Sequence, residues 1–167
     1  GLGDVYKRQI VNSTIISVPS STKNKEKKRD PDAHQVKKGN TWHFGYKAHI
    51  GVDRDSGLVH TVEATAANVH DATETSKLLT GDEDEVYGDS GYLGAEKRGD
   101  AIIRNKAGRK IKYRINRRPS QVKKLSKSGQ YAAKKAEHAK SSVRAKVEHA
   151  FGVVKKQLRF RKTRYRG

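Results

Sequence analysis

The stretch WHFGYKAHIGVDRDSGLVHTVEA (residues 42–64) holds the strongest structural pattern in the chain, an alternation of apolar and polar residues around a turn. Its first part places apolar side chains at every second position: Trp42, Phe44, Tyr46, Ala48, Ile50 and Val52. A period of two is typical of a strand. Residues 53–57 (DRDSG) have turn chemistry, and residues 58–64 return as a second strand. The sequence therefore predicts an antiparallel hairpin here.

Other elements are expected on both sides of this hairpin. The β-branched residues 10–18 (IVNSTIISV) predict a central strand. Further strands are expected at 85–89 and 110–115, and helices at 72–79 (with Asp71 as the cap), 94–104 and 131–162, with a basic loop at 22–40 and a basic linker at 116–130. This order predicts an α/β fold of RNase-H-like layout, a mixed sheet flanked by helices, with a basic helical C-terminal part.

Charge is unevenly distributed along the 167 residues. Residues 1–103 hold 14 Lys+Arg and 16 Asp+Glu, whereas residues 104–167 hold 23 Lys+Arg and only two acids, Glu137 and Glu148. Basic segments can be disordered or can bind acidic membranes. A segment with a net charge of +21 nevertheless favours nucleic acid, the usual polyanionic partner.

Several protein classes are excluded by composition. The chain has no Cys, which excludes disulfide scaffolds, thiolate zinc sites and cysteine nucleophiles. It has no run of 18 apolar residues and no signal-peptide core in its first 30 residues, so neither a membrane span nor classical secretion is expected. The hydrophobic fraction of 33% is enough for a modest core in a single domain.

The two ends of the chain suggest a fragment. The sequence contains no Met, so we interpret it as part of a longer protein. Residues 1–9 (GLGDVYKRQ) are interpreted as a foreign or disordered start, resembling translated adapter sequence. Residues 10–167 are expected to form one domain that is truncated at both ends.

The C-terminal helix carries two distinct patterns. Apolar residues at helical spacing predict a buried stripe of Val143, Val147, Ala150, Val154 and Leu158. Polar residues Arg144, Glu148 and Lys155, with Phe151, lie at i, i+4, i+11 and i+7 on an adjacent face. From these residues alone, Glu148 is either a solvated acid paired with Arg144 or part of a site.

Five stretches, taken in order, resemble the DDE transposases of bacterial insertion sequences, most closely the IS-five group. They are residues 10–24, 29–53, 65–71 (TAANVHD), 86–94 (VYGDSGYLG) and 142–167 (SVRAKVEHAFGVVKKQLRFRKTRYRG). The resemblance implies an RNase-H-like core that cuts DNA at the element ends and joins the free 3′-hydroxyl to target DNA. It also implies two divalent ions, Mg²⁺ or Mn²⁺, held by three carboxylates, since carboxylates suit hard cations.

The family's Asp, Asp and Glu fall on Asn12, Asp89 and Glu148. Asp89 and Glu148 would hold metal, but Asn12 supplies only a neutral carbonyl oxygen where relatives carry an acid. The resemblance therefore predicts impaired catalysis in this chain. Asp53 is a candidate substitute carboxylate, although an Asp beside Asp55 and Gly57 is more typical of a turn.

The resemblance also implies partners and a setting. DNA contacts are expected from Lys47, His49, Arg144, Lys155, Lys156 and Arg159. Lys47 and His49 alternate onto one strand face, where they either approach the scissile phosphate or decorate the sheet. The expected partners are element-end DNA, target DNA and further copies of the chain, in the bacterial cytoplasm near the nucleoid. Two alternatives remain: a non-catalytic basic nucleic-acid-binding protein, such as a decayed transposase, and an RNase-H-like nuclease without strand transfer.

Overall fold

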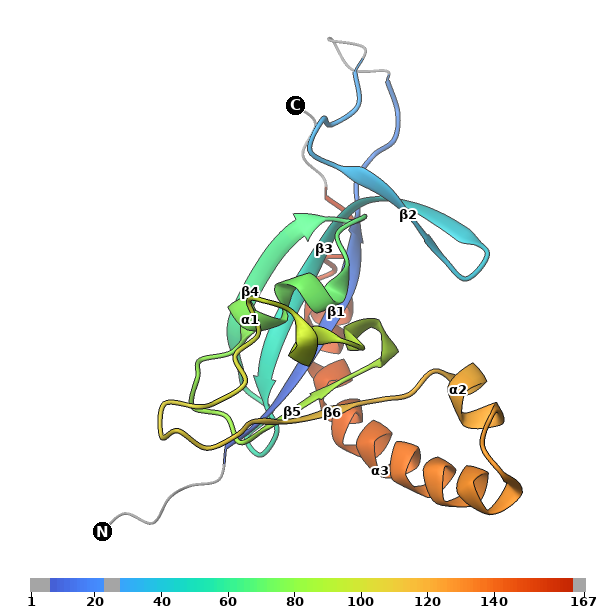
Figure 1. The fold of residues 1–167 in the computed structure, drawn as a ribbon. Coiled ribbons are helices and arrows are strands. Elements are labelled where there is room, and N and C mark those ends of the chain that lie inside the picture. Colours follow the sequence, from blue (N-terminus) through green and yellow to red (C-terminus); the bar gives the residue numbers. More distant parts are fainter. Residues whose placement is uncertain (1–6, 23–27, 164–167) are drawn as a thin grey trace.

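A computed structural model describes residues 7–22 and 28–163 of the chain. Its centre is a six-stranded mixed sheet in the order β2-β3-β1-β5-β6, with β4 also paired to β3 (Figure 1). The strands are β1 (Arg8–Ser17), β2 (His34–Lys38), β3 (Thr41–Asp53), β4 (Val59–Ala66), β5 (Glu85–Gly88) and β6 (Lys112–Ile115).

The pairing of these strands confirms the predicted α/β, RNase-H-like architecture. β1 is central, antiparallel to β3 and parallel to β5, and β5 is parallel to β6. β4 returns antiparallel to β3, which confirms the predicted hairpin. Asp53 belongs to the turn of this hairpin, where its Oδ1 accepts hydrogen bonds from the backbone N–H groups of Asp55 and Ser56 at 3.0 and 2.6 Å. The turn interpretation of Asp53 is therefore confirmed.

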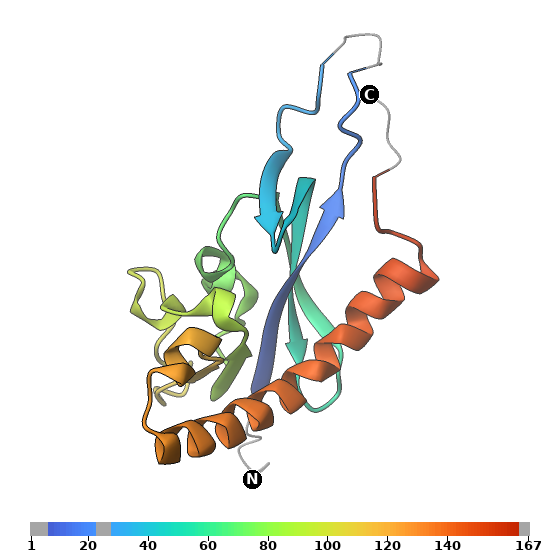
Figure 2. The same ribbon diagram turned by 90° about the vertical axis from the view of Figure 1, so that its right-hand side faces the viewer.

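Helices cover both faces of the sheet. The long helix α3 (Lys127–Gly152) lies on one face, while η1 (Asp71–Glu74), α1 (Thr75–Leu78), η2 (Ser90–Tyr92) and η3 (Ala95–Lys97) lie on the other (Figure 2). The short helix α2 (Pro119–Lys123) precedes α3, and the π-helical turn η4 (Val153–Gln157) continues it. Of the helices in the described residues, none combines the length and the apolar character needed to cross a membrane.

The two faces of β1 serve two separate cores. Val11 packs with Leu78, Val86 and Tyr92 beneath the short helices. Ile10 packs with Val147 of α3 on the opposite face. Because neighbouring residues of a strand point to opposite faces, β1 is buried on both sides, as its near-continuous apolar sequence predicts.

Several local predictions were wrong. Residues 94–104 form only the short η3, because Gly94 has a φ of +86° and the chain then turns through Gly99 and Asp100. The basic loop contains β2, which was not predicted, and the expected basic linker contains α2 and the start of α3. Leu158 is 70% exposed, so the predicted apolar stripe does not extend to it.

The start of β1 also differs from the prediction. β1 begins at Arg8, and Gln9 is buried within the sheet, where its side-chain amide donates to the carbonyl oxygen of Leu78. The last two residues of the supposed foreign start therefore belong to the fold. Residues 1–6 lie outside the described residues, so their foreign origin stays a prediction.

Candidate active site

The C-terminal ends of the parallel strands meet at one edge of the sheet. The last paired residues of β1 and β5 are Ile10 and Tyr87. Two residues further along, the same register aligns Asn12 with Asp89. Both residues therefore follow the paired part of β1 and β5, at the same end of the sheet. Two of the three residues expected at the active site are thus brought to one edge.

Asn12 and Asp89 are held by local hydrogen bonds. Asn12 shares the α3 face of β1 with Ile10, and its Oδ1 accepts a hydrogen bond from the backbone N–H of Ser13 at 2.8 Å. Asp89 is the N-cap of η2, and its Oδ1 accepts from the backbone N–H of Gly91 at 2.7 Å. A carboxylate is favoured at such a cap. Both side chains are half-buried, and so remain partly accessible to solvent.

α3 supplies Glu148 from the flank that faces this edge. Val147 is fully buried against the sheet, which fixes the rotation of the helix. On one flank, the Lys146 amino group donates to the carbonyl oxygen of Arg54, near the start of β1. On the other flank, Arg144 donates to Asn116, directly after β6. Glu148 follows Arg144 by four residues and so shares its flank. Its side chain is exposed on this flank of α3.

Arg144 is oriented by a side-chain contact. Its Nη1 donates to Asn116 Oδ1 at 2.9 Å, and Asn116 continues the strand register next to Asp89. The Arg144 Nε is buried and has no hydrogen-bond partner among the described residues. No ion pair joins Arg144 to Glu148 in the part of the chain that the structure describes. The charges of Arg144 and Glu148 are thus not paired with each other in the described residues.

The oxygen atoms of Asn12, Asp89 and Glu148 are of the type that divalent ions bind. The three side chains nevertheless carry one negative charge fewer than three carboxylates would. Asp89 and Glu148 offer hard carboxylate oxygens, and Asn12 offers an amide oxygen of the kind that Mg²⁺ and Ca²⁺ accept. However, no group of three or more His, Asp or Glu side chains within residues 7–22 and 28–163 is arranged to hold a metal ion. A two-ion centre would therefore lack one negative charge at position 12.

A third acid, Asp71, approaches Asp89 from the other face. A Cβ placed on Gly91 would lie 2.9 Å from Asp89 Oδ1 and 3.0 Å from Asp71 Oδ2. Both carboxylates therefore border the same glycine, and any side chain at position 91 would collide with them. The sequence interpretation missed this role. Asp71 was predicted to cap a helix, but the structure assigns the cap to His70, whose Nδ1 accepts from Ala72 N–H.

Asp71 is held by two basic residues of β3. The Lys47 amino group lies 3.0 Å from Asp71 Oδ1 and also donates to the carbonyl oxygen of Val69 at 2.7 Å. The Nδ1 of His49 lies 3.8 Å from the same carboxylate oxygen. Lys47 and His49 therefore share one face, as predicted, but this face is interior. His49 is fully buried, which leaves it no surface for direct contact with DNA.

Burial shifts the proton equilibria of this cluster. Burial lowers the pKa of His49, although the nearby Asp71 carboxylate opposes the shift. The neutral form of His49 is thus favoured, and its Nε2 lies 2.8 Å from the Thr65 hydroxyl. Tyr92 is also fully buried, and burial together with Asp71 and Asp89 raises the pKa of its hydroxyl.

Replacing Asp71 by Asn is expected to destabilise the fold by roughly 2 kcal/mol. Lys47 is only 12% exposed, and it would lose the opposing carboxylate charge while keeping its hydrogen bond to Val69. Breaking a fully buried pair costs about 3–5 kcal/mol, and this pair is partly exposed. Denaturant unfolding of the variant measures the loss. Asp55→Asn is the matched control, because Asp55 is 54% exposed and exposed ion pairs contribute less than about 1 kcal/mol. Equal stability of the two variants would contradict the account.

The remaining predicted DNA contacts lie beyond α3. Lys156 and Arg159 are exposed, and Lys155 is half-buried. Burial lowers the pKa of Lys155, and the positive charges of Lys38 and Arg161 add to the effect. Cations from β2, η4 and the segment after it are therefore close to one another, which concentrates positive charge at this end of the molecule.

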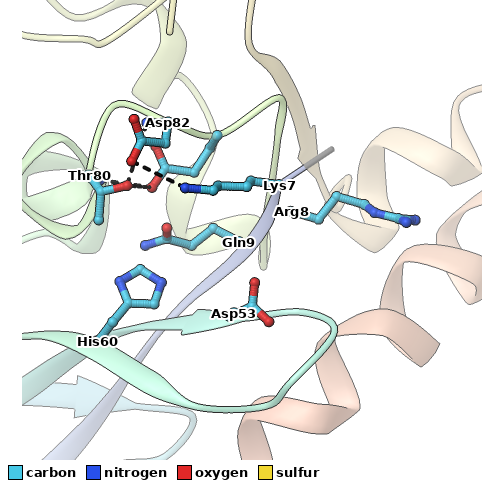
Figure 3. Close-up of a pocket in the computed structure, with 8 residues that line it drawn as sticks. Lys7, Arg8, Gln9, Asp53, His60, Thr80 and Asp82 are labelled. Atoms are coloured by element: carbon cyan, nitrogen blue, oxygen red, sulfur yellow. Dashed lines mark hydrogen bonds and ion pairs between the residues drawn. The ribbon is translucent and has the colours of Figure 1, made fainter. Parts of the chain in front are cut away.

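A hollow of about 240 Å³ lies at the start of β1 (Figure 3). Its rim includes Lys7 and Asp82, which form an ion pair of 3.4 Å. Ligands of α/β sheets bind at the carboxyl ends of parallel strands, whereas this hollow lies at the amino end. It is therefore separate from the candidate active site.

Comparison with known proteins identifies the family of the chain. Residues 4–167 match the family described as the transposase DDE domain. The match does not distinguish the IS-five group, so that finer assignment stays a prediction. No solved structure matches the chain. Because the matched region spans nearly all 167 residues, the chain belongs to the transposase DDE domain family.

Proposed function

We propose that this chain is the catalytic core of an insertion-sequence transposase, which cleaves DNA at element ends and transfers the strands to a target. The observation that carries the proposal is the strand register that aligns Asn12 with Asp89, with Glu148 on the flank of α3 above the same edge. In this proposal three side chains from distant parts of the sequence would meet there, as a phosphodiester-cleaving centre requires.

In this proposal the site residues have different tasks. Asp89 and Glu148 would hold Mg²⁺ or Mn²⁺, which supplies activation of the attacking oxygen and stabilisation of the leaving oxygen. Arg144, half-buried and oriented by Asn116, would position a DNA phosphate through its guanidinium group. Asn12 lacks the negative charge of a carboxylate, so the site would bind metal weakly and work slowly.

The Lys47–Asp71–His49 cluster would act through Asp89 rather than on DNA. By fixing Asp71 against Gly91, it holds the η2 turn whose N-cap is Asp89. Lys47 and His49 are thus proposed as positioning residues, in place of the direct DNA contacts that the sequence suggested. Lys155, Lys156 and Arg159 remain proposed phosphate contacts, and pairing of two element ends would require a second copy of the chain.

The test is a supercoiled-plasmid assay with Mg²⁺ or Mn²⁺, read out for nicked and for joined products. Metal-dependent nicking together with joined molecules supports the transposase proposal. Nicking without any joined product would favour the nuclease alternative. Binding of DNA without metal and without nicking, even after Asn12→Asp, would favour the non-catalytic binding protein.

DNA affinity is expected to fall steeply with salt. A protein that neutralises 6–10 phosphates loses about 10³–10⁵ in affinity between 50 and 200 mM salt, because bound counterions are released. The net charge of +21 in residues 104–167 supports contacts on this scale. Fluorescence anisotropy of a labelled duplex at several salt concentrations measures the slope. A flat response would exclude the proposed phosphate contacts.

A further inference from the structure

The β2–β3 hairpin carries an exposed aromatic surface that the proposed active site does not use. The hairpin projects away from the parallel part of the sheet (Figure 1). Its indole ring, Trp42, is 64% exposed. Trp42 faces Lys37 across the hairpin, and the Lys37 amino group lies 6.0 Å from the centre of the ring. The exposed part of this ring is available for contact with a ligand.

A groove of about 450 Å³ lies beside this ring. Trp42 and Phe44 supply aromatic walls, Arg29 and Lys162 supply charge, and Gln35 and His43 supply polar groups. The groove joins three distant segments, because Lys162 comes from the chain after η4 and pairs as a bridge with Ser17 at the end of β1. None of the described residues that line the groove is acidic. Its chemistry therefore suits an anionic ligand with a flat ring.

Positive charge surrounds the groove. Arg29 lies 5.9 Å from the centre of the Phe44 ring. Lys38 at the end of β2 is close enough to Lys155 to lower the pKa of its amino group, and Arg161 adds to the shift. The nearest acid along the chain, Asp30, accepts a hydrogen bond from the Tyr46 hydroxyl at 2.8 Å. The cations thus crowd one another, which a bound phosphate backbone would relieve.

We propose that this groove binds an unpaired base of a DNA strand, with Trp42 stacking on the base and the surrounding cations holding the flanking phosphates. The inference rests on the proposed function, since a protein that cuts and joins DNA ends meets unpaired bases at the ends it processes. Stacking on an aromatic ring requires a base that has left the duplex stack. The groove should therefore prefer single-stranded or distorted DNA to an intact duplex.

The composition of the chain makes the test direct. Trp42 is the only Trp in the sequence, so the intrinsic Trp fluorescence of the full chain reports on this one ring. Titration with a short oligothymidine is expected to quench the emission in a saturable manner. A perfectly paired duplex of equal length should quench it much less, even where it binds through the C-terminal cations.

Variants separate stacking from general attraction of DNA. Trp42→Ala is expected to weaken oligothymidine binding about tenfold by anisotropy, the loss typical of one stacked base, while duplex binding changes little. Trp42→Phe should keep most of the affinity, because a ring remains. Tyr131→Ala is the matched control, since Tyr131 is 77% exposed on α3, and it should leave oligothymidine binding unchanged.

The outcomes are distinguishable. Unchanged Trp emission on binding of oligothymidine, or equal affinities of Trp42→Ala and the unsubstituted chain, would overturn the groove assignment alone. Binding of neither oligothymidine nor duplex would overturn both this inference and the DNA partner of the proposed function. Loss of duplex binding in Trp42→Ala as strong as the loss of oligothymidine binding would assign Trp42 to the duplex instead and overturn the inference.

Discussion

Replacing Asn12 by Asp is expected to raise metal-dependent plasmid nicking by about 100-fold or more. The register brings residue 12 and Asp89 to the same end of the sheet, where a second carboxylate would give the metal ions the negative charge that Asn12 does not supply. Metal stabilisation of developing charge contributes several kcal/mol, and each 1.36 kcal/mol is worth tenfold in rate. Initial nicking rates of the two proteins, at matched Mg²⁺ concentrations, measure the gain.

A second readout of Asn12→Asp does not depend on activity. Without metal, the new carboxylate and Asp89 carry like charges at the same end of the sheet, and like charges that lie close together repel each other. The variant should therefore be less stable than the unsubstituted chain in EDTA. Added Mg²⁺ should raise its melting temperature more than it raises that of the unsubstituted chain, because only the folded state binds the ion tightly. Equal shifts in the two proteins would count against residue 12 as a ligand.

In the Asn12→Asp background, Asp89→Asn or Glu148→Gln is expected to abolish nicking. Each change replaces a carboxylate, proposed as a metal ligand, by a neutral amide of similar shape and should leave the fold intact. Asn is as good an N-cap as Asp, so η2 keeps its cap after Asp89→Asn. Glu148 is exposed on α3, and a Gln is a good helix former at that position.

The control for both variants is Asp55→Asn, in the exposed β3–β4 turn at the far end of the sheet. It removes one carboxylate without touching the candidate edge, and should keep the full nicking rate. Thermal unfolding of all variants shows whether a loss of activity reflects chemistry or folding. If Glu148→Gln retained the full rate, the assignment of the helical acid would be wrong.

Much of the sheet could be predicted from local patterns. Alternation from Trp42 to Val52 and the turn at residues 53–57 indicated the hairpin, because the period of two and the turn chemistry agree. β2 was missed because its sequence, HQVKK, has one apolar residue, and pairing with β3 rather than burial determines it. Residues 94–104 were predicted to form a helix, but the helical path that begins after Gly94 ends at Lys97, and the chain turns through Gly99 and Asp100.

The candidate site was only partly readable from the sequence. Asp89 and Glu148 were predicted from the order of motifs, and Asn12 from its place in the first strand, and their roles stay predictions. Asp71 was missed because its partner, Lys47, lies 24 positions earlier, and only the folded sheet brings the two together. The burial of His49 could not be predicted for the same reason. Strand alternation shows which residues share a face of the sheet, but not which element covers that face.

The most direct test of the account is a crystal structure of the Asn12→Asp protein grown with Mn²⁺, with the ions located by anomalous scattering. The account predicts Mn²⁺ at the C-terminal edge of β1 and β5, bound by the carboxylates at positions 12, 89 and 148, with two ions about 3.5–4 Å apart when DNA is present. Mn²⁺ at other residues, or Asp89 and Glu148 side chains that point away from each other without a shared ion, would contradict it.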